Sequence, residues 1–173
     1  MINGKLFERV HPCLVQKDTY IGNVNGVMNA VIVHGNPVGE SVLQGEGAGP
    51  GATSSALMSD LLSILRGNIK YSFGIPESKR KKVVTYNANN SSNSLYFRFE
   101  VKDKPGVLSE ITKLFANNKI SIERVIQIPD HKKQSASIVI ITHKSLEYRS
   151  QNLIKSLKKN RNIIKKPVLI RLF

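Results

Sequence analysis

The sequence contains few of the features that would point to a metal site, a disulfide or a membrane. Its one cysteine, Cys13, cannot form an internal disulfide, and the four histidines are scattered without zinc-type spacing. The longest apolar runs, such as residues 138–141, fall far short of the roughly 20 residues that a membrane helix needs. The first residues have neither a signal peptide nor a transit peptide pattern. We therefore expect a cytoplasmic protein with no membrane span and no structural metal.

The charge is strongly unbalanced, with 26 lysines and arginines against 12 acidic residues and a net charge of +14. Such an excess raises nucleic acid or an anionic membrane as a partner. Residues 1–70, however, contain five basic and five acidic side chains, so the excess lies entirely after residue 70. There the lysines are spread over several predicted elements and do not cluster on one face. This distribution favours a general lysine bias over a nucleic-acid footprint.

The first part of the chain, residues 1–70, has the pattern of a small mixed unit. With 173 residues and 40% hydrophobic content, the whole chain suits one ordinary domain or two small ones. A glycine-rich loop at 45–51 follows a β-rich hairpin and precedes a helix that we expect to be capped by Thr53. The expected strands are 5–15, 27–33 and 40–44, and the helix extends to Gly67. Three strands and one helix bury too little surface to be stable alone, so this half is expected to need a partner.

A linker is predicted over residues 71–94, because its end, 87–94, consists almost entirely of asparagine and serine. The second domain is predicted over 95–173. Its patterns follow the order β-α-β-β-α-β, which is the ferredoxin-like arrangement of a four-stranded antiparallel sheet with both helices on one face. The fold class is therefore α+β, an incomplete α/β portion followed by a ferredoxin-like domain.

Apolar periodicity locates the elements of this second domain. Residues 95–101 alternate as a strand with one buried face, and 107–115 carry the apolar stripe of an amphipathic helix. Further strands are predicted at 120–128, 135–142 and 168–172, and a second helix begins at Ser145. The side chains expected to face the core in the second and last strands are Ile120, Ile122, Ile126 and Ile128, and Val168, Ile170 and Leu172.

Three segments of this half resemble an ACT domain: 103–112 (DKPGVLSEIT), 120–127 (ISIERVIQ) and 140–143 (IITH). The resemblance implies a sensor that binds an amino acid where two copies pack side by side, at the first strand-to-helix turn. Free N–H groups of Gly106, Val107 and Leu108 at the helix start suit a ligand carboxylate. Asp103 could accept from the ligand's ammonium group. Alternatively, Asp103 only caps its own helix and Gly106 only turns the chain.

The first half, followed by an ACT domain, resembles the C-terminal part of homoserine dehydrogenase. The resemblance rests on 9–12 (RVHP), 23–30 (NVNGVMNA) and 45–53 (GEGAGPGAT). It implies NAD(P)-dependent interconversion of L-homoserine and L-aspartate 4-semialdehyde in threonine and methionine biosynthesis. It also implies allosteric feedback by threonine, and contact between the cofactor and the loop containing Gly47 and Gly49.

The nucleotide-binding domain and the catalytic residues of that family would lie upstream of anything in this sequence. Residues 47–52 match the dinucleotide fingerprint G-x-G-x-x-G/A, but no following strand carries the required acidic residue. We therefore expect no catalytic residue here and NADP or NAD only in a complete enzyme. The expected partners are an amino-acid effector and a second copy through the ACT domains. Either a separate chain supplies the nucleotide-binding domain, or the sequence is a truncated gene product whose first half is poorly folded by itself.

Two other functions remain open at this stage. One is a free-standing ACT regulatory protein that docks on another enzyme. The other is a nucleic-acid binder on a ferredoxin-like sheet, which is disfavoured because Tyr96, Arg98 and Glu100 on the open face lack an aromatic pair for base stacking. His11, His34 and Cys13 are catalytic candidates only by elimination.

Overall fold

The computed structural model describes residues 2–68, 71 and 74–173. The chain divides into two compact units, which we describe separately. The larger unit combines Met1–Leu14 with Val83–Phe173, and the smaller unit is Val15–Lys82. The domain boundary predicted between residues 70 and 71 involves positions 69, 70, 72 and 73, which lie outside the described residues. No described helix is both long and apolar enough to cross a membrane.

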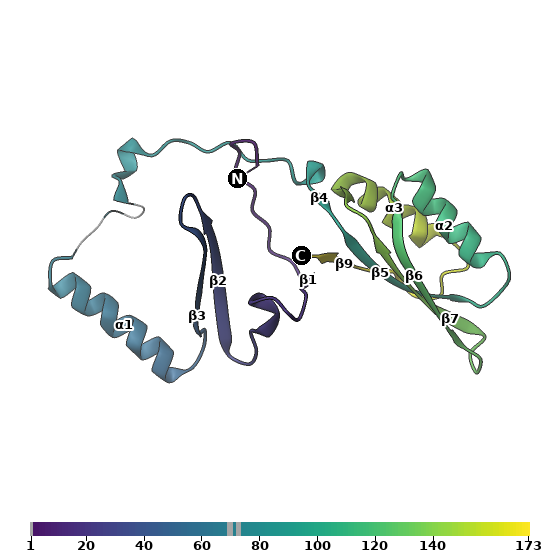
Figure 1. The fold of residues 1–173 in the computed structure, drawn as a ribbon, viewed down its shortest axis with the longest axis horizontal. Coiled ribbons are helices and arrows are strands. Elements are labelled where there is room, and N and C mark those ends of the chain that lie inside the picture. The colour runs from purple at the N-terminus through teal and green to yellow at the C-terminus, as the bar shows by residue number, and fades with distance from the viewer. Residues whose placement is uncertain (1, 69–70, 72–73) are drawn as a thin grey trace. The chain divides into compact units, whose positions relative to one another are not determined.

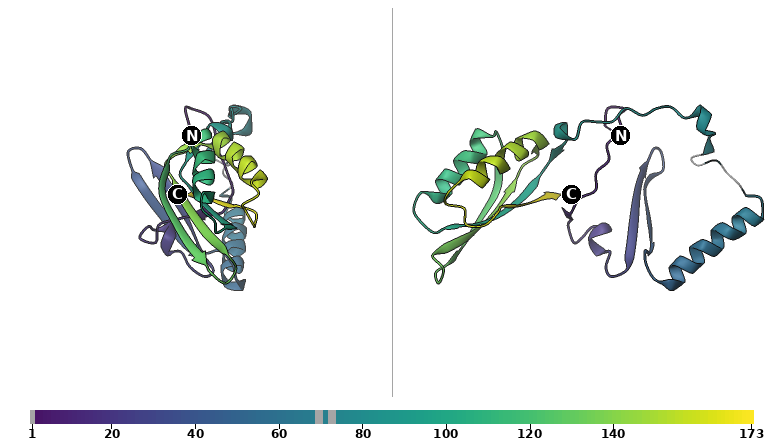
Figure 2. Two further views of the ribbon diagram at one scale, coloured as in Figure 1. Left: turned by 90° about the vertical axis from the view of Figure 1, so that its right-hand side faces the viewer. Right: turned by 180° about the vertical axis from the view of Figure 1, so that it is seen from behind.

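The larger unit contains the predicted β-α-β-β-α-β fold. Its central strands form an antiparallel sheet in the order β9-β5-β7-β6. Both helices cover the same face of this sheet, as two views show (Figures 1 and 2). The elements are β5 (Leu95–Lys102), α2 (Val107–Asn117), β6 (Ile122–Asp130), β7 (Ser135–Thr142), α3 (Glu147–Lys159) and β9 (Val168–Leu172). The α+β class and the ferredoxin-like order are confirmed.

The core lies between the sheet and the two helices. Alternate residues of β5, from Leu95 to Val101, are buried, as its period-two pattern predicts. Phe97 of β5 meets Phe115 of α2 edge-to-face, with ring centroids 5.1 Å apart. The other buried apolar side chains are Leu95, Phe99, Val101, Val107, Ile111, Ile120, Ala136, Ile138, Ile140, Leu153 and Leu157.

Two outer strands differ from the prediction. Ile126 and Ile128 of β6 were expected in the core, but they are exposed, Ile128 to 59%. In β9, Leu169 pairs with Phe97 and packs against the core, so Val168 and Ile170 lie on the opposite, uncovered face. Alternation identifies a strand, but it does not say which of two apolar faces meets the helices.

The predicted strand over 5–15 is mostly wrong. Only β1 (Cys13–Leu14) is a strand, and it pairs in parallel with β9. Before it, Leu6 makes an isolated bridge to Thr85. The intervening residues have no neighbouring strand, and Pro12 has no N–H to give to one.

The end of the predicted linker is ordered against the second domain. The 3₁₀ turn η4 (Ala88–Asn90) precedes β4 (Ser92–Asn93), which pairs with β8 (Ser145–Leu146) just before α3. A further 3₁₀ turn, η3, lies at Glu77–Lys79.

The smaller unit has little interior. It consists of the 3₁₀ turn η1 (Ile21–Asn23), the hairpin β2 (Met28–Gly35) and β3 (Gly39–Glu46), and α1 (Pro50–Leu65). The hairpin and the helix confirm the prediction, although α1 is capped by Gly49 and not by Thr53, which lies in its first turn. None of its described residues is buried, and apolar side chains such as Leu43, Leu57 and Leu61 are exposed.

Candidate functional site

The β5–α2 turn forms one side of a cavity of about 410 Å³ in the larger unit. The chain leaves β5 at Lys102, makes the turn 103–106 and enters α2 at Val107. The opposite side is contributed by Gln127 of β6, and Ile138 of β7 lies between them. The cavity is lined by Val101, Lys102, Asp103, Lys104, Pro105, Gly106, Val107, Leu108, Gln127 and Ile138. All four residues that the sequence proposes for ligand binding are therefore in one place.

Gly106 shapes the turn. Its φ of +87° is left-handed, which a side chain would strain, and open space surrounds the position of a Cβ atom. It caps α2, and that cap has no side-chain hydrogen bond. The N–H of Val107 is not free, because it donates to the carbonyl of Lys104 at 3.3 Å. Among the described residues, the N–H groups of Gly106 and Leu108 have no backbone or side-chain acceptor.

Asp103 does not cap the helix. Its carboxylate instead accepts a hydrogen bond from the side-chain amide of Gln127, with 3.4 Å between Nε2 and Oδ1. Both side chains are exposed, so the carboxylate retains lone pairs for a further donor. Gln127 is a cavity residue that the sequence did not single out, because nothing local to β6 indicates that it faces a turn 24 positions earlier in the chain.

This cavity has the polarity of an amino-acid site. The two free N–H groups lie at the positive end of α2, and Lys102 and Lys104 add positive charge for a carboxylate. Asp103 offers negative charge for an ammonium group. Leu108 and Ile138 supply apolar surface for a small side chain.

The glycine loop of the smaller unit leads into α1. A Cβ on Gly47 would come within 1.9 Å of the side chain of Asn29, which would have to move to make room for it. Gly49 has a φ of +118° and open space around its Cα, directly before a helix of 16 residues. A ligand could therefore approach the backbone closely at Gly49. The loop thus leaves its backbone open to a ligand at the N-terminus of α1.

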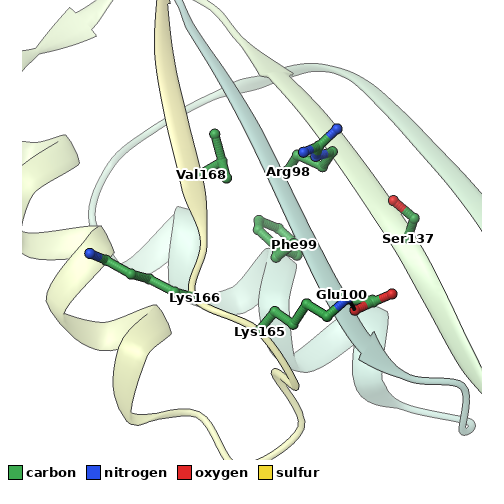
Figure 3. A pocket seen from close by; sticks show the side chains of 7 residues that line it. All are labelled: Arg98, Phe99, Glu100, Ser137, Lys165, Lys166 and Val168. Atoms are coloured by element: carbon green, nitrogen blue, oxygen red, sulfur yellow. Dashed lines mark ion pairs between the residues drawn. The ribbon is translucent and has the colours of Figure 1, made fainter.

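A second cavity, of about 220 Å³, lies on the uncovered face of the sheet. Figure 3 shows Lys165 paired with Glu100, at 2.7 Å, while the side chain of Lys166 extends away from Arg98 and Ser137. Lys165 is thus neutralised by Glu100, and the side chains of Lys166 and Arg98 point in different directions, so the three cations do not converge on one ligand position.

His11, His34 and Cys13, the three residues considered as catalytic candidates, do not form a catalytic cluster. His11 is half-buried and its ring nitrogen lies 2.9 Å from the carbonyl oxygen of Pro12. His34 faces Glu40 across the hairpin at 3.5 Å, and Cys13 lies in β1. Among the described residues, no group of three or more histidine, cysteine or acidic side chains could hold a metal ion.

The fold and the turn cavity of the larger unit define the class of this part of the chain. Residues 96–162 match the family model of the ACT domain, and residues 3–62 match that of homoserine dehydrogenase. The chain belongs to the homoserine dehydrogenase family and corresponds to the C-terminal part of these enzymes.

Individual relatives agree along almost the whole chain. Homoserine dehydrogenase of Helicobacter pylori is 33% identical over 164 residues, which are 95% of this chain and 38% of that protein. The Neisseria gonorrhoeae enzyme is 35% identical over 159 residues, or 87% of this chain and 36% of that protein. The crystal structure of a homoserine dehydrogenase from Thiobacillus denitrificans aligns with a TM-score of 0.79 and 30% identity, over 95% of this chain and 38% of that one. The chain thus spans less than two fifths of the length of these relatives.

Proposed function

We propose that this chain is the effector-binding part of a homoserine dehydrogenase, together with the closing elements of its catalytic domain. Residues 1–70 would belong to the catalytic domain, 71–94 to the linker and 95–173 to the regulatory domain. Joined to a nucleotide-binding part, the protein would interconvert L-homoserine and L-aspartate 4-semialdehyde with NADP or NAD in the cytoplasm. The observation that carries this proposal is the joint match of both halves, in this order, to one family.

The β5–α2 cavity would bind an amino acid, with threonine as the proposed effector. Its carboxylate would be held by the N–H groups of Gly106 and Leu108, and its ammonium group by Asp103. Val107 would line the cavity at the start of the helix. Its N–H would not bind the carboxylate, since it already donates to the carbonyl of Lys104. The hydrogen bond between Asp103 and Gln127 supports this assignment, because it holds the carboxylate over the cavity and away from the helix.

We expect saturating threonine to raise the melting temperature of the chain by at least about 5 °C, measured by circular dichroism. Asp103→Asn removes the negative charge that would face the ammonium group and should weaken binding at least about tenfold in calorimetry, about 1.4 kcal/mol. Glu123→Gln is a matched neutralisation of an exposed carboxylate outside the cavity and should bind normally. Failure of all twenty amino acids to bind would contradict the effector assignment.

The regulatory domains would pair side by side through β6. This strand is at the edge of the sheet, with β7 as its one neighbour, and Val125, Ile126 and Ile128 are exposed on it. An edge strand of nine residues with exposed apolar side chains is suited to pairing with another strand. A second copy at this edge would also lie beside Gln127 and close the cavity.

The smaller unit would bury its exposed apolar side chains against the nucleotide-binding part of the enzyme. Its helix α1 carries Leu57, Met58, Leu61, Ile64 and Leu65 on one face, and all five are exposed, which is typical of a helix whose apolar face is covered in the complete protein. The cofactor supplies hydride chemistry when bound. This chain would contribute the backbone of Gly47 and Gly49 at the edge of that site.

We expect the purified chain to show no homoserine oxidation with NADP or NAD, because it corresponds to less than two fifths of the length of these enzymes. Turnover should appear when a homoserine dehydrogenase nucleotide-binding part, made as a separate chain, is added. Leu61→Asp on α1 should weaken this association at least about tenfold in size-exclusion or calorimetric titration, because it places a charge in an apolar contact. Lys155→Asp on α3 is the control. Turnover by the chain alone would contradict the proposal, and amino-acid binding without association would favour a free-standing regulatory protein.

A further inference from the structure

Three segments that are distant in the sequence meet at one buried carboxylate in the larger unit. Glu147, the first residue of α3, is only 3% exposed. Arg171 of β9 donates to it from Nε at 3.1 Å and also from Nη2. Arg9 donates from Nη1 to Oε2 at 3.2 Å. The side chains of the two arginines are 16% and 19% exposed, so the ion pairs are largely shielded from solvent.

The connection that follows the smaller unit reaches the same point. The backbone N–H of Glu147 donates to the carbonyl of Ser91 at 2.8 Å. Arg9 reaches the hydroxyl of Ser91 from Nη2 at 3.4 Å, and Asn93 lies at 3.5 Å from the Glu147 carboxylate. The chain passes from the larger to the smaller unit after Leu14 and returns at Val83. The segment that precedes the smaller unit is thus attached to Glu147 through Arg9, and the segment that follows it is attached through Ser91.

The other contacts of the first passage are shallow. Leu6 exchanges two backbone hydrogen bonds with the returning strand, its N–H with Val84 and its carbonyl with Tyr86. Phe7 meets Tyr86 edge-to-face at 5.8 Å. None of the described residues from Ile2 to Leu14 is buried, so little hydrophobic free energy fixes this segment. Cys13 and Leu14 also pair with the end of β9. The Arg9–Glu147 pair is the contact that ties this segment to a buried charged group.

We propose that Glu147 is the anchor that fastens both connections of the smaller unit to the ACT fold. Without its charge, residues 5–14 and 84–94 detach from the larger unit while the core between sheet and helices stays folded. Arg171, which belongs to the fold itself, holds the carboxylate in place for Arg9. The anchor thereby holds the two segments that border Val15–Lys82 in the sequence, whether or not a ligand occupies the β5–α2 cavity.

Hydrogen exchange by mass spectrometry on the full chain tests this anchor. In Glu147→Gln, peptides covering 5–14 and 84–94, including the amides of Leu6 and Tyr86, should exchange at least tenfold faster. Peptides of β5, β7 and α2 should accelerate less than these, by the loss of fold stability that follows when Arg171 loses its partner carboxylate. Arg9→Gln leaves the Glu147–Arg171 pair intact and should give the same local acceleration, which separates anchoring from a loss of fold stability.

Glu110→Gln is the matched control. This carboxylate also accepts two side-chain hydrogen bonds, from Asn160 at 2.9 Å and Asn162 at 2.7 Å, but it contacts neither connection. Its exchange changes should be confined to residues near 160. Unchanged exchange at 5–14 and 84–94 in both test variants would overturn the proposal. A uniform acceleration that includes β5 and β7 in Arg9→Gln would overturn it as well.

Discussion

Phe115→Ala should unfold most of the larger unit at room temperature in mild denaturant. Phe115 is fully buried under the sheet and contacts Phe97 edge-to-face. Removing a buried phenylalanine side chain costs about 3–5 kcal/mol, since it combines lost transfer free energy with a residual cavity. A small domain is stable by only about 5–15 kcal/mol, so this one substitution removes a large share of it. Urea unfolding followed by circular dichroism measures the change.

The control for this prediction is Leu65→Ala. Leu65 is an apolar residue at the end of α1 that is 73% exposed, and its truncation should change stability by no more than about 0.5 kcal/mol. The contrast separates burial from hydrophobicity of the residue type. A loss smaller than about 1 kcal/mol for Phe115→Ala would mean that the core between sheet and helices is not packed as described.

Arg171→Met should destabilise the larger unit by about 3 kcal/mol at neutral pH, because it leaves the buried Glu147 with Arg9 as its one remaining cation. Methionine keeps much of the volume and removes the charge. The exposed Arg161→Met is the control and should be nearly neutral. Denaturant titration at pH 7 gives both values. Equal stability of the two variants would show that the Arg171 pair contributes nothing net.

The pH dependence of the same variant has a definite sign. Burial alone would raise the pKa of Glu147, but the hydrogen bonds and positive charges of Arg171 and Arg9 outweigh it, so the pKa lies below its ordinary value. A carboxyl with a lowered pKa contributes stability above its unfolded pKa, and this stability is lost as the pH falls through the folded pKa. In Arg171→Met, burial opposes ionisation with less compensation. The destabilisation by Arg171→Met should therefore be largest at neutral pH and should shrink as the pH falls, because the variant loses less stability than the unmodified chain when Glu147 is protonated. Denaturant titrations at a series of pH values measure this trend.

Local periodicity was enough to predict the interior of the larger unit. The alternation of β5 and the stripe of α2 are produced by burial on one face, and both were read correctly from neighbouring residues. The turn between them carries its own signal in Gly106, whose left-handed backbone favours glycine. These features depend on residues within one or two turns of each other, which is why the sequence shows them.

The errors arose where a residue's environment depends on distant chain. Residues 5–15 are rich in strand-forming types, yet only two of them find a neighbouring strand. Ile126 and Ile128 have the composition of core residues but lie on an edge strand, where the far side is open. The Arg9–Glu147 pair joins residues 138 positions apart, and no spacing rule connects an arginine in an irregular segment with the first residue of a helix.

The parallel pairing of β1 with β9 has a consequence for biosynthesis. Cys13 lies opposite Arg171 and Leu14 opposite Leu172, so the two partners emerge from the ribosome about as far apart in time as this chain allows. Contacts of such long sequence separation form late, because a large loop must close first. While it waits, the nascent chain displays the unburied apolar side chains of α1, a surface of the kind that chaperones shield. Pairing of β1 with β9 should therefore form after the more local contacts of the β5–β9 fold.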